Sequence, residues 1–191
     1  RKDLEWYALE SADDQHPPWL SWKDDVTAVV FDASFAGCRP TSAFLWFCDC
    51  YNLKSIEGLE GMDFSEVVTA HSMFKNCCSL VSVSLPSGLR FLDEYMFFNC
   101  TSLTSLTIPS SVTYVAPTAI LSCGALRTIV VEAGHVRRLK ELFKAAGLDI
   151  SGLEFVVADS VARAVLEDSG KTLRFVYDSN DYPGTKNANW F

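Results

Sequence analysis

Cysteine is the residue type in this chain with the most varied chemistry, and four of its seven copies lie in two close groups. Cys48 and Cys50 flank Asp49, and Cys77 is followed directly by Cys78. Four thiolates brought to one point are a common ligand set for a structural zinc ion. The two groups therefore define one candidate metal site, provided that the fold turns all four thiols toward a common centre.

Nucleophilic catalysis is the second chemistry to consider, because it needs a general base beside a serine or cysteine. The three histidines, His16, His71 and His135, are far apart in the chain, and only His71 has several thiols and hydroxyls near it in sequence. The acidic stretch 178–181 has part of the spacing of a calcium loop, but no glutamate ligand follows it. We expect His71 to be a surface or loop residue and the stretch 178–181 to be a turn. We predict no catalytic residue and no cofactor.

Charge and hydropathy exclude two classes of partner. The chain of 191 residues has 49% apolar residues, enough to fold, and its 16 basic and 24 acidic residues give a formal net charge of −8. That sign disfavours nucleic acid and anionic lipid. No apolar run approaches the roughly 18 residues of a membrane span. We therefore expect no nucleic-acid partner and no membrane insertion by this segment, and any export signal or anchor is expected outside this sequence.

Four segments of the chain align on one template, which constrains the fold more than any single residue does. In each, an aromatic or aliphatic residue lies three positions before a cysteine, and a leucine lies three positions after it; the segments are 46–56, 73–83, 96–106 and 119–129. The aligned cysteines are separated by 27, 23 and 23 residues. Self-similarity at this period predicts an α/β leucine-rich-repeat solenoid, here a short one of about four repeats.

The repeat register gives the aligned cysteines and leucines a structural role. We expect them to form a buried ladder made of Cys50, Cys77, Cys100, Cys123, Leu53, Leu80, Leu103 and Leu126. A free cysteine behaves there as a small hydrophobe. Neighbouring thiols would lie about 4.8 Å apart with nearly parallel side chains, whereas a disulfide needs Cβ atoms that converge to about 3.8 Å. The pattern predicts reduced thiols and no metal site, since Cys50 and Cys77 would point inward and Cys48 and Cys78 elsewhere.

Each ladder leucine is expected to open a short strand, and the strands, over 53–56, 80–85, 103–108 and 126–131, are expected to stack into one continuous parallel sheet. The outward positions then align in two columns that are rich in hydroxyl groups. They read Ser55, Ser82, Ser105 and Thr128 in one column and Glu57, Ser84, Thr107 and Val130 in the other. This surface is the best candidate for binding a protein or glycan through many weak hydrogen bonds. The alternative is that small polar residues only keep an exposed sheet soluble.

The ends of the chain read as different units. Residues 1–34 are expected to form an amino-terminal cap with a strand over 26–31, and residues 35–133 hold the repeats. Trp6, Tyr7, Trp19 and Trp22 could form a carbohydrate platform, but sealing of the solenoid end is favoured.

Residues 134–159 are expected to form a carboxy-terminal cap with an amphipathic helix that ends before Gly147 and a strand over 153–158. The basic outer side of that helix is expected to be solvated. Residues 160–191 are expected to hold a β-hairpin and a tail, or the start of a further module.

The repeat pattern (Met/Ala)-Phe-x-x-Cys-x-x-Leu, together with Ile108-Pro109-Ser110-Ser111-Val112 after one strand, resembles the BspA-like branch of bacterial leucine-rich-repeat surface proteins. The resemblance covers residues 26–131. Two further stretches resemble segments common in these proteins: residues 29–36 followed by 39–42 and 46–47, and residues 164–166 with 173–178. It implies a secreted or cell-surface protein of a host-associated bacterium that acts in adhesion or protein binding, and it supplies no catalytic residue. The expected partner is therefore a host or bacterial surface protein or glycan. The alternative is a structural spacer within a larger surface protein.

Overall fold

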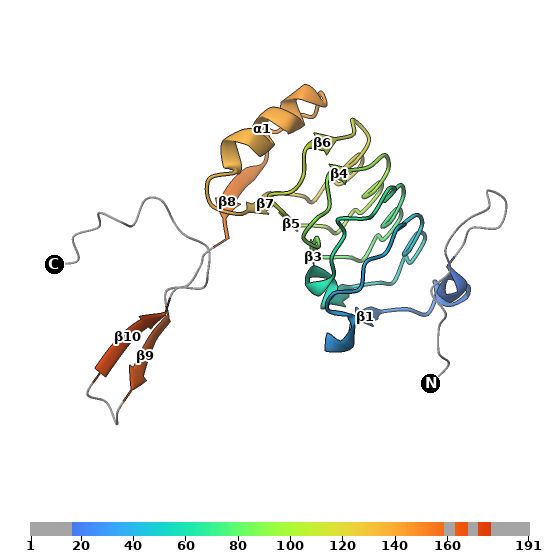
Figure 1. Ribbon diagram of the computed structural model, residues 1–191. Helices are drawn as coiled ribbons and strands as arrows, with labels where there is room; N and C mark the ends of the chain where they lie inside the picture. The colour runs from blue at the N-terminus through green and yellow to red at the C-terminus, as the bar shows by residue number, and fades with distance from the viewer. Residues whose placement is uncertain (1–16, 159–162, 168–171, 177–191) are drawn as a thin grey trace.

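The computed structural model describes residues 17–158, 163–167 and 172–176. From residue 28 onward the chain winds through successive turns, each of which adds a short strand beside the one before it (Figure 1). The strands of this stack are β1 (Ala28–Val30), β2 (Ser55–Glu57), β3 (Ser82–Ser84), β5 (Ser105–Ile108), β7 (Thr128–Val131) and β8 (Glu154–Val157). All pairs between them are parallel. Such stacking is required by the sequence, because no single turn can bury its apolar side alone.

Each ladder leucine lies two residues before a strand rather than at its start, which corrects the predicted strand boundaries. The Leu80 amide donates to the Cys77 oxygen at 3.1 Å, and the Leu103 amide donates to the Cys100 oxygen at 3.1 Å. These bonds close a bend, so sheet pairing begins only after the leucine. The same bend explains why the inward–outward alternation of the sequence skips once in each repeat.

The segments before the ladder cysteines form tight turns that stack directly on one another. The Phe47 amide donates to the Met73 oxygen, and the Phe74 amide donates to the Met96 oxygen, both at 2.8 Å. The rings of Phe47 and Phe74 stack with centroids 5.5 Å apart, and those of Phe74 and Phe97 with centroids 5.1 Å apart. The core therefore contains a column of rings, one from each of the first three of these turns, and Ile120 holds the equivalent position in the fourth.

A second, narrower parallel ladder runs along another side of the stack. Strand β4 (Phe91–Leu92) pairs with β6 (Tyr114–Val115), and isolated bridges join Ser42 to Thr69 and Asp63 to Ser87. The sequence did not predict this ladder, because strands of two residues are too short to show a periodicity.

The prediction of one continuous sheet is wrong. Strands β1 and β2 form a two-stranded sheet of their own, separate from the four-stranded sheet β3-β5-β7-β8. Seven residue steps lead from Ile56 to Asp63, whereas four lead from Val83 to Ser87, the bridge partner of Asp63. The longer path contains the short helix η3 (Leu59–Gly61). It offsets β2 from β3 and interrupts the sheet there.

The amino-terminal segment packs against the first turn through the helices η1 (Pro18–Trp22) and η2 (Ala33–Phe35) and through β1. The Trp19 indole nitrogen donates to the Trp46 oxygen at 2.5 Å, and the two rings meet edge to face at 6.2 Å. Trp19 is thus a packing residue. Trp22, by contrast, is 57% exposed. Trp6 and Tyr7 lie outside the described residues, as does His16.

The carboxy-terminal part consists of the helix α1 (Val136–Ala145), strand β8 and a hairpin. The helix buries Leu139 and Phe143, and Gly147, at φ 74°, follows its end. Strand β8 pairs with β7 and so belongs to the main sheet. Strands β9 (Arg163–Glu167) and β10 (Thr172–Val176) pair antiparallel, as the pattern predicted. The turn between them and the acidic stretch 178–181 lie outside the described residues. No helix in the described part of the chain is long and apolar enough to cross a membrane.

Candidate binding face of the sheet

Five hydroxyl residues of the main sheet lie side by side on its outer surface. Ser82 pairs with Ser105 and Ser105 with Thr128, while Ser84 pairs with Thr107. All five are exposed or half-buried, whereas the residues that alternate with them in the strands are buried. We call these five residues, Ser82, Ser84, Ser105, Thr107 and Thr128, the hydroxyl face.

The hydroxyl groups of this face are available for binding. Within the described residues, none of the five side chains makes a hydrogen bond to the protein. Other hydroxyls of the stack are occupied: Thr104 Oγ1, for example, donates to the Val81 oxygen at 3.1 Å. A surface with unpaired donors and acceptors on a rigid sheet can form several hydrogen bonds with one partner, each worth about 0.5–1.5 kcal/mol net.

Strand β8 extends both columns, which the sequence did not reveal. Thr128 pairs with Glu154, so the first column ends on a carboxylate. Thr107 pairs with Val130, and Val130 with Val156, so the second column becomes apolar. The strand 153–158 was expected, but its register against β7 could not be inferred without a repeat motif in it. The alternation of that strand was the only available signal.

Ser55 and Glu57, the remaining predicted members of the columns, lie in the two-stranded sheet. They pair there with Ala28 and Val30, and Val30 is 67% exposed. The structure therefore does not bring Ser55 and Glu57 into one ladder with the hydroxyl face.

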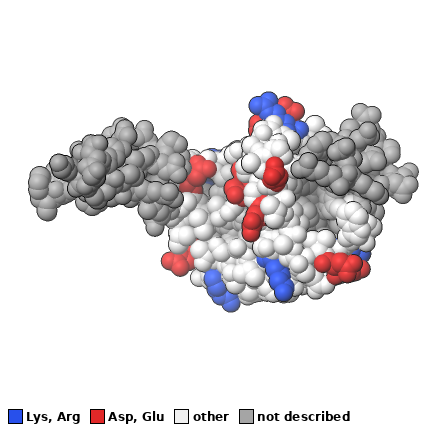
Figure 2. All heavy atoms as spheres, turned by 90° about the horizontal axis from the view of Figure 1, so that it is seen from below, with Lys and Arg blue, Asp and Glu red and all other residues white. Residues whose placement is uncertain are grey.

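Charge is sparse on one face of the molecule. Figure 2 shows Lys, Arg, Asp and Glu in small separate groups among uncharged residues on the face seen from below Figure 1. Within the described residues, ion pairs are confined to Arg39 with Asp63 and Glu66 and to Lys144 with Glu141. This face is therefore not expected to attract a strongly charged partner over a long range.

The cysteines are free thiols, and four of the seven are buried: Cys48, Cys50, Cys77 and Cys100. Burial raises the pKa of Cys48 to about 12 and that of Cys50 to about 11, with the Asp49 carboxylate adding to both. The pKa of Cys77 is raised well above its usual value, again mainly by burial. These environments favour the neutral thiol, whereas a metal ligand or nucleophile must be a thiolate.

The two cysteine groups of the candidate metal site do not meet. Cys77 Sγ lies inside the stack, 3.1 Å from the Phe47 oxygen, while Cys78 Sγ turns to the next repeat and lies 3.4 Å from the Asn99 oxygen. The described residues contain no group of three or more His, Cys, Asp or Glu side chains placed to hold a metal ion.

Cys100 and Cys123 form a coupled pair at the end of the ladder. The hydrogen-bonding contact between the two side chains, together with burial, raises the pKa of Cys100, and the same contact lowers the pKa of Cys123. Cys123 is half-buried, unlike the three ladder cysteines before it. It is therefore the ladder thiol that loses a proton most readily.

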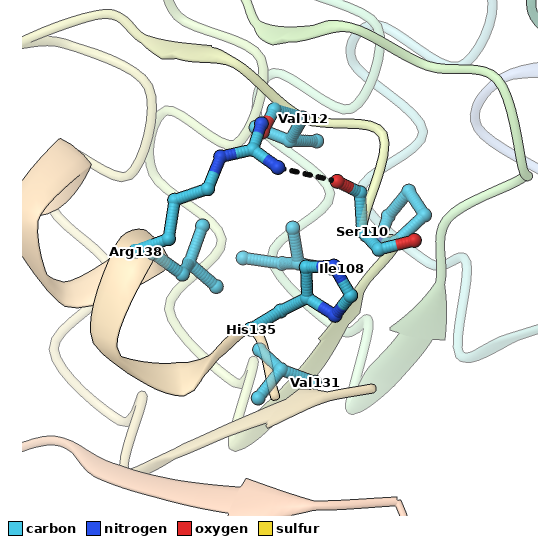
Figure 3. Close-up of a pocket in the computed structure, with 8 residues that line it drawn as sticks. Ile108, Ser110, Val112, Val131, His135 and Arg138 are labelled. Carbon is cyan, nitrogen blue, oxygen red and sulfur yellow. Dashed lines mark hydrogen bonds between the residues drawn. The ribbon is translucent and has the colours of Figure 1, made fainter. Parts of the chain in front are cut away.

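His71 and His135, the histidines in the described part of the chain, contact groups other than thiols. His71 contacts the rings of Phe44 and Tyr95, and His135 Nδ1 lies 3.0 Å from the Ala133 oxygen. A small cleft beside His135 is lined by Ile108, Pro109, Ser110, Val112, Val131, His135, Arg138 and Leu139 (Figure 3). It encloses about 10 Å³, the size that holds one water molecule.

Arg138, which lines this cleft, joins α1 to the repeat before it. Its guanidinium group donates to the Ser110 oxygen at 3.1 Å and to the Val112 oxygen at 2.5 Å (Figure 3). The charge therefore fastens α1 to the loop after β5. One residue of the basic helix side is thus a structural clamp rather than a free surface cation.

A ladder of side-chain amides that the sequence did not predict joins the tight turns. Asn76 Nδ2 donates to Asp49 Oδ1 at 2.7 Å, and Asn99 Nδ2 donates to Asn76 Oδ1 at 3.0 Å. Each of these residues directly precedes a ladder cysteine and has positive φ, between 59° and 62°. Asn and Asp tolerate this conformation better than other residues with a side chain. The recurring Asp/Asn before the cysteine was the available signal.

Comparisons with known proteins identify the repeat. A family model described as a BspA type leucine rich repeat region matches residues 45–146 in six copies, more than the four segments that the sequence alignment recognised. No curated protein matches the chain.

One solved structure is similar: the crystal structure of a leucine rich cell surface protein from Faecalibacterium prausnitzii A2-165 at 1.80 Å resolution, with 22% sequence identity and a TM-score of 0.46. The similarity covers 61% of this chain and 34% of that one. The family match stands independently of that likeness and spans more than half of the 191 residues. The chain therefore belongs to the BspA type leucine rich repeat family.

Proposed function

We propose that this chain is a non-enzymatic binding or adhesion module, displayed outside a bacterial cell, that recognises a protein or glycan through the hydroxyl face. The observation that carries the proposal is the alignment of five unpaired hydroxyl side chains in two columns on one rigid sheet. Proteins of this family are cell-surface proteins with suggested roles in protein binding or adhesion, which supports the same conclusion.

The proposed architecture is a short solenoid closed at both ends. The packing of Trp19 on Trp46 supports closure at the first turn, and the Arg138 clamp with the buried Phe143 supports closure by α1 at the last. Ser55 and Glu57 then form a separate flank of the binding surface beside the hydroxyl face.

The alternative function is a spacer that holds another domain away from the cell surface. The hydroxyl face would then serve only solubility, and substitution of its residues would change no interaction. A catalytic role has no support from the thiols, whose environments favour the neutral form, or from the cleft beside His135, which has no room for a substrate.

A binding screen tests the proposal. The purified chain is applied to immobilised extracellular-matrix proteins and to a glycan array, beside a variant with Ser82→Lys and Ser105→Lys. A matched control carries Ser65→Lys and Ser87→Lys, two exposed serines outside the main sheet. Binding that is lost in the first variant and kept in the second supports the hydroxyl face. Binding that survives both, or the absence of any binding at high protein concentration, contradicts it, and the latter favours the spacer.

A further inference from the structure

Four aromatic side chains form a second continuous surface feature, in the tight turns rather than in the strands. Phe44 contacts His71 with centroids 5.7 Å apart, His71 contacts Tyr95 at 5.8 Å, and Tyr95 contacts Phe98 at 5.7 Å. All four are half-buried, so each presents part of its ring to solvent. We call Phe44, His71, Tyr95 and Phe98 the aromatic strip; it crosses three successive turns, one ring wide.

The strip contains two polar atoms without partners. His71 Nδ1 is buried and makes no hydrogen bond, and within the described residues the Tyr95 hydroxyl makes none either. A buried polar atom left unpaired costs about 1–3 kcal/mol, and folded proteins contain few of them. The rings of Phe44 and Tyr95 flank the imidazole and Nδ1 is buried, so the hydrogen-bonding group that the strip can offer a ligand is the Tyr95 hydroxyl.

Charges of both signs border the strip. Lys75 Nζ lies 6.0 Å from the centre of the Phe98 ring. Glu94 is exposed beside Tyr95, and the Asp93 carboxylate is occupied by Thr69 Oγ1 and by the Ala70 and Glu94 amides. Neither sign dominates, so the surroundings give no net attraction to a strongly anionic or cationic ligand.

The size of the strip decides between classes of partner. An aromatic side chain has roughly 150–250 Å² of surface, and each of these four residues exposes only the smaller part of it, so together they present at most about 300 Å². A stable protein–protein interface takes about 800 Å² from each partner. A narrow row of rings with interspersed hydrogen-bonding groups fits instead a linear ligand that is itself one ring wide, with apolar C–H faces and a rim of hydroxyl groups.

We propose that the aromatic strip binds a neutral oligosaccharide, with its sugar rings against Tyr95 and Phe98, close to His71, and a hydroxyl group bonded to the Tyr95 hydroxyl. This surface is distinct from the hydroxyl face, and its occupation does not depend on the function proposed for that face.

The test uses the full chain and neutral oligosaccharides of three to six units, built from glucose, galactose, mannose or N-acetylglucosamine, on an array and then in solution. Tyr95→Ala and Phe98→Ala are expected to weaken binding at least tenfold, and Tyr95→Phe, which keeps the ring, by a smaller factor. Tyr114→Ala is the matched control, since Tyr114 is 54% exposed in β6, outside the strip, and is expected to leave binding unchanged. Circular dichroism and thermal unfolding verify that each variant is folded.

Nuclear magnetic resonance supplies a second readout that does not depend on a variant. The imidazole signals of His71 are expected to shift and saturate as the oligosaccharide is added, while those of His135 stay fixed. The proposal is overturned by the absence of binding at millimolar concentrations, by equal losses in Tyr114→Ala and Tyr95→Ala, or by binding that leaves His71 unperturbed. A glycan lost only in the Ser82→Lys, Ser105→Lys variant would assign binding to the hydroxyl face and would overturn the strip alone.

Discussion

The Cys100 thiol donates a hydrogen bond to the backbone oxygen of Phe74, which lies 3.1 Å away in the preceding turn. Cys77 has the same relation to Phe47, at 3.1 Å, and Cys123 to Phe97, at 2.9 Å. The ladder cysteines therefore do more than fill a small buried space. Cys77, Cys100 and Cys123 each link their turn to the aromatic position of the turn before it, which explains why the two residue types recur together in the repeat.

Replacement of Cys100 by alanine is expected to lower the free energy of unfolding by about 1–3 kcal/mol, because it leaves a small cavity and removes this hydrogen bond. Urea denaturation measures the change. Cys78→Ala is the control, since Cys78 is half-buried and outside the ladder, and is expected to cost less than about 1 kcal/mol. Equal losses in the free energy of unfolding for the two variants would show that a ladder cysteine contributes no more to stability than a cysteine outside the ladder.

Much of the stack was predictable from the template, because the spacing of Phe, Cys and Leu fixes which side chains lie inside. Leu53, Leu80 and Leu103 are fully buried, as the period required. The strand starts were not predictable to the residue, since the bend at each leucine depends on a backbone bond to the cysteine and not on a side chain. The break between β2 and β3 was missed for a related reason: the longer spacing of 27 residues was visible, but where the extra residues lie was not.

The hydroxyl face and the aromatic strip also differ in how far the sequence predicts them. The pairing of Ser82 with Ser105 follows from the repeat itself, so sequence suffices to place these two residues together. The aromatic strip does not follow a single column of the template. Phe44 and His71 are equivalent, each six residues before a ladder cysteine, but Tyr95 lies five residues before Cys100, so the contact of His71 with Tyr95 joins positions that are not equivalent. Contacts of that kind need the coordinates, since the repeat register relates only equivalent positions.

Two variants of Asn76 are expected to separate the cost of its lost side-chain hydrogen bonds from the cost of its positive φ. Asn76→Ala loses both side-chain hydrogen bonds and places alanine at φ 62°, so it is expected to cost about 2–4 kcal/mol. Asn76→Gly loses the same bonds but adopts this φ without strain, so it is expected to cost about 1–2 kcal/mol less than the alanine variant. Urea denaturation of the two variants gives the comparison. An alanine variant as stable as the glycine variant would contradict the role of backbone conformation.

Gly58 is expected to be required for attachment of the first strand. A Cβ at this position would meet the Phe31 oxygen far inside van der Waals contact, and φ is 78°. Gly58→Ala should therefore lower the free energy of unfolding by more than about 2 kcal/mol and expose the amino-terminal segment to limited proteolysis. Gly37→Ala separates the two causes, since φ there is 82° but nothing lies within 4 Å of the added Cβ. Its cost is expected to be about 1 kcal/mol. Identical behaviour of the two variants would argue against a close approach at Phe31.

Alkaline pH is expected to destabilise the fold through its buried thiols. Burial raises the pKa of Cys50 from 9.0 to about 11 and that of Cys48 to about 12, so the unfolded chain loses these protons at lower pH than the folded chain does. The stabilisation is fully present below about pH 9 and is lost as the pH rises through 11 and 12. Each thiol contributes a slope of at most about 1.4 kcal/mol per pH unit. Urea denaturation between pH 8 and pH 11 under reducing conditions measures the slope, and Cys50→Ala should make it shallower. A slope that this variant leaves unchanged would assign the alkaline effect to lysine and tyrosine instead.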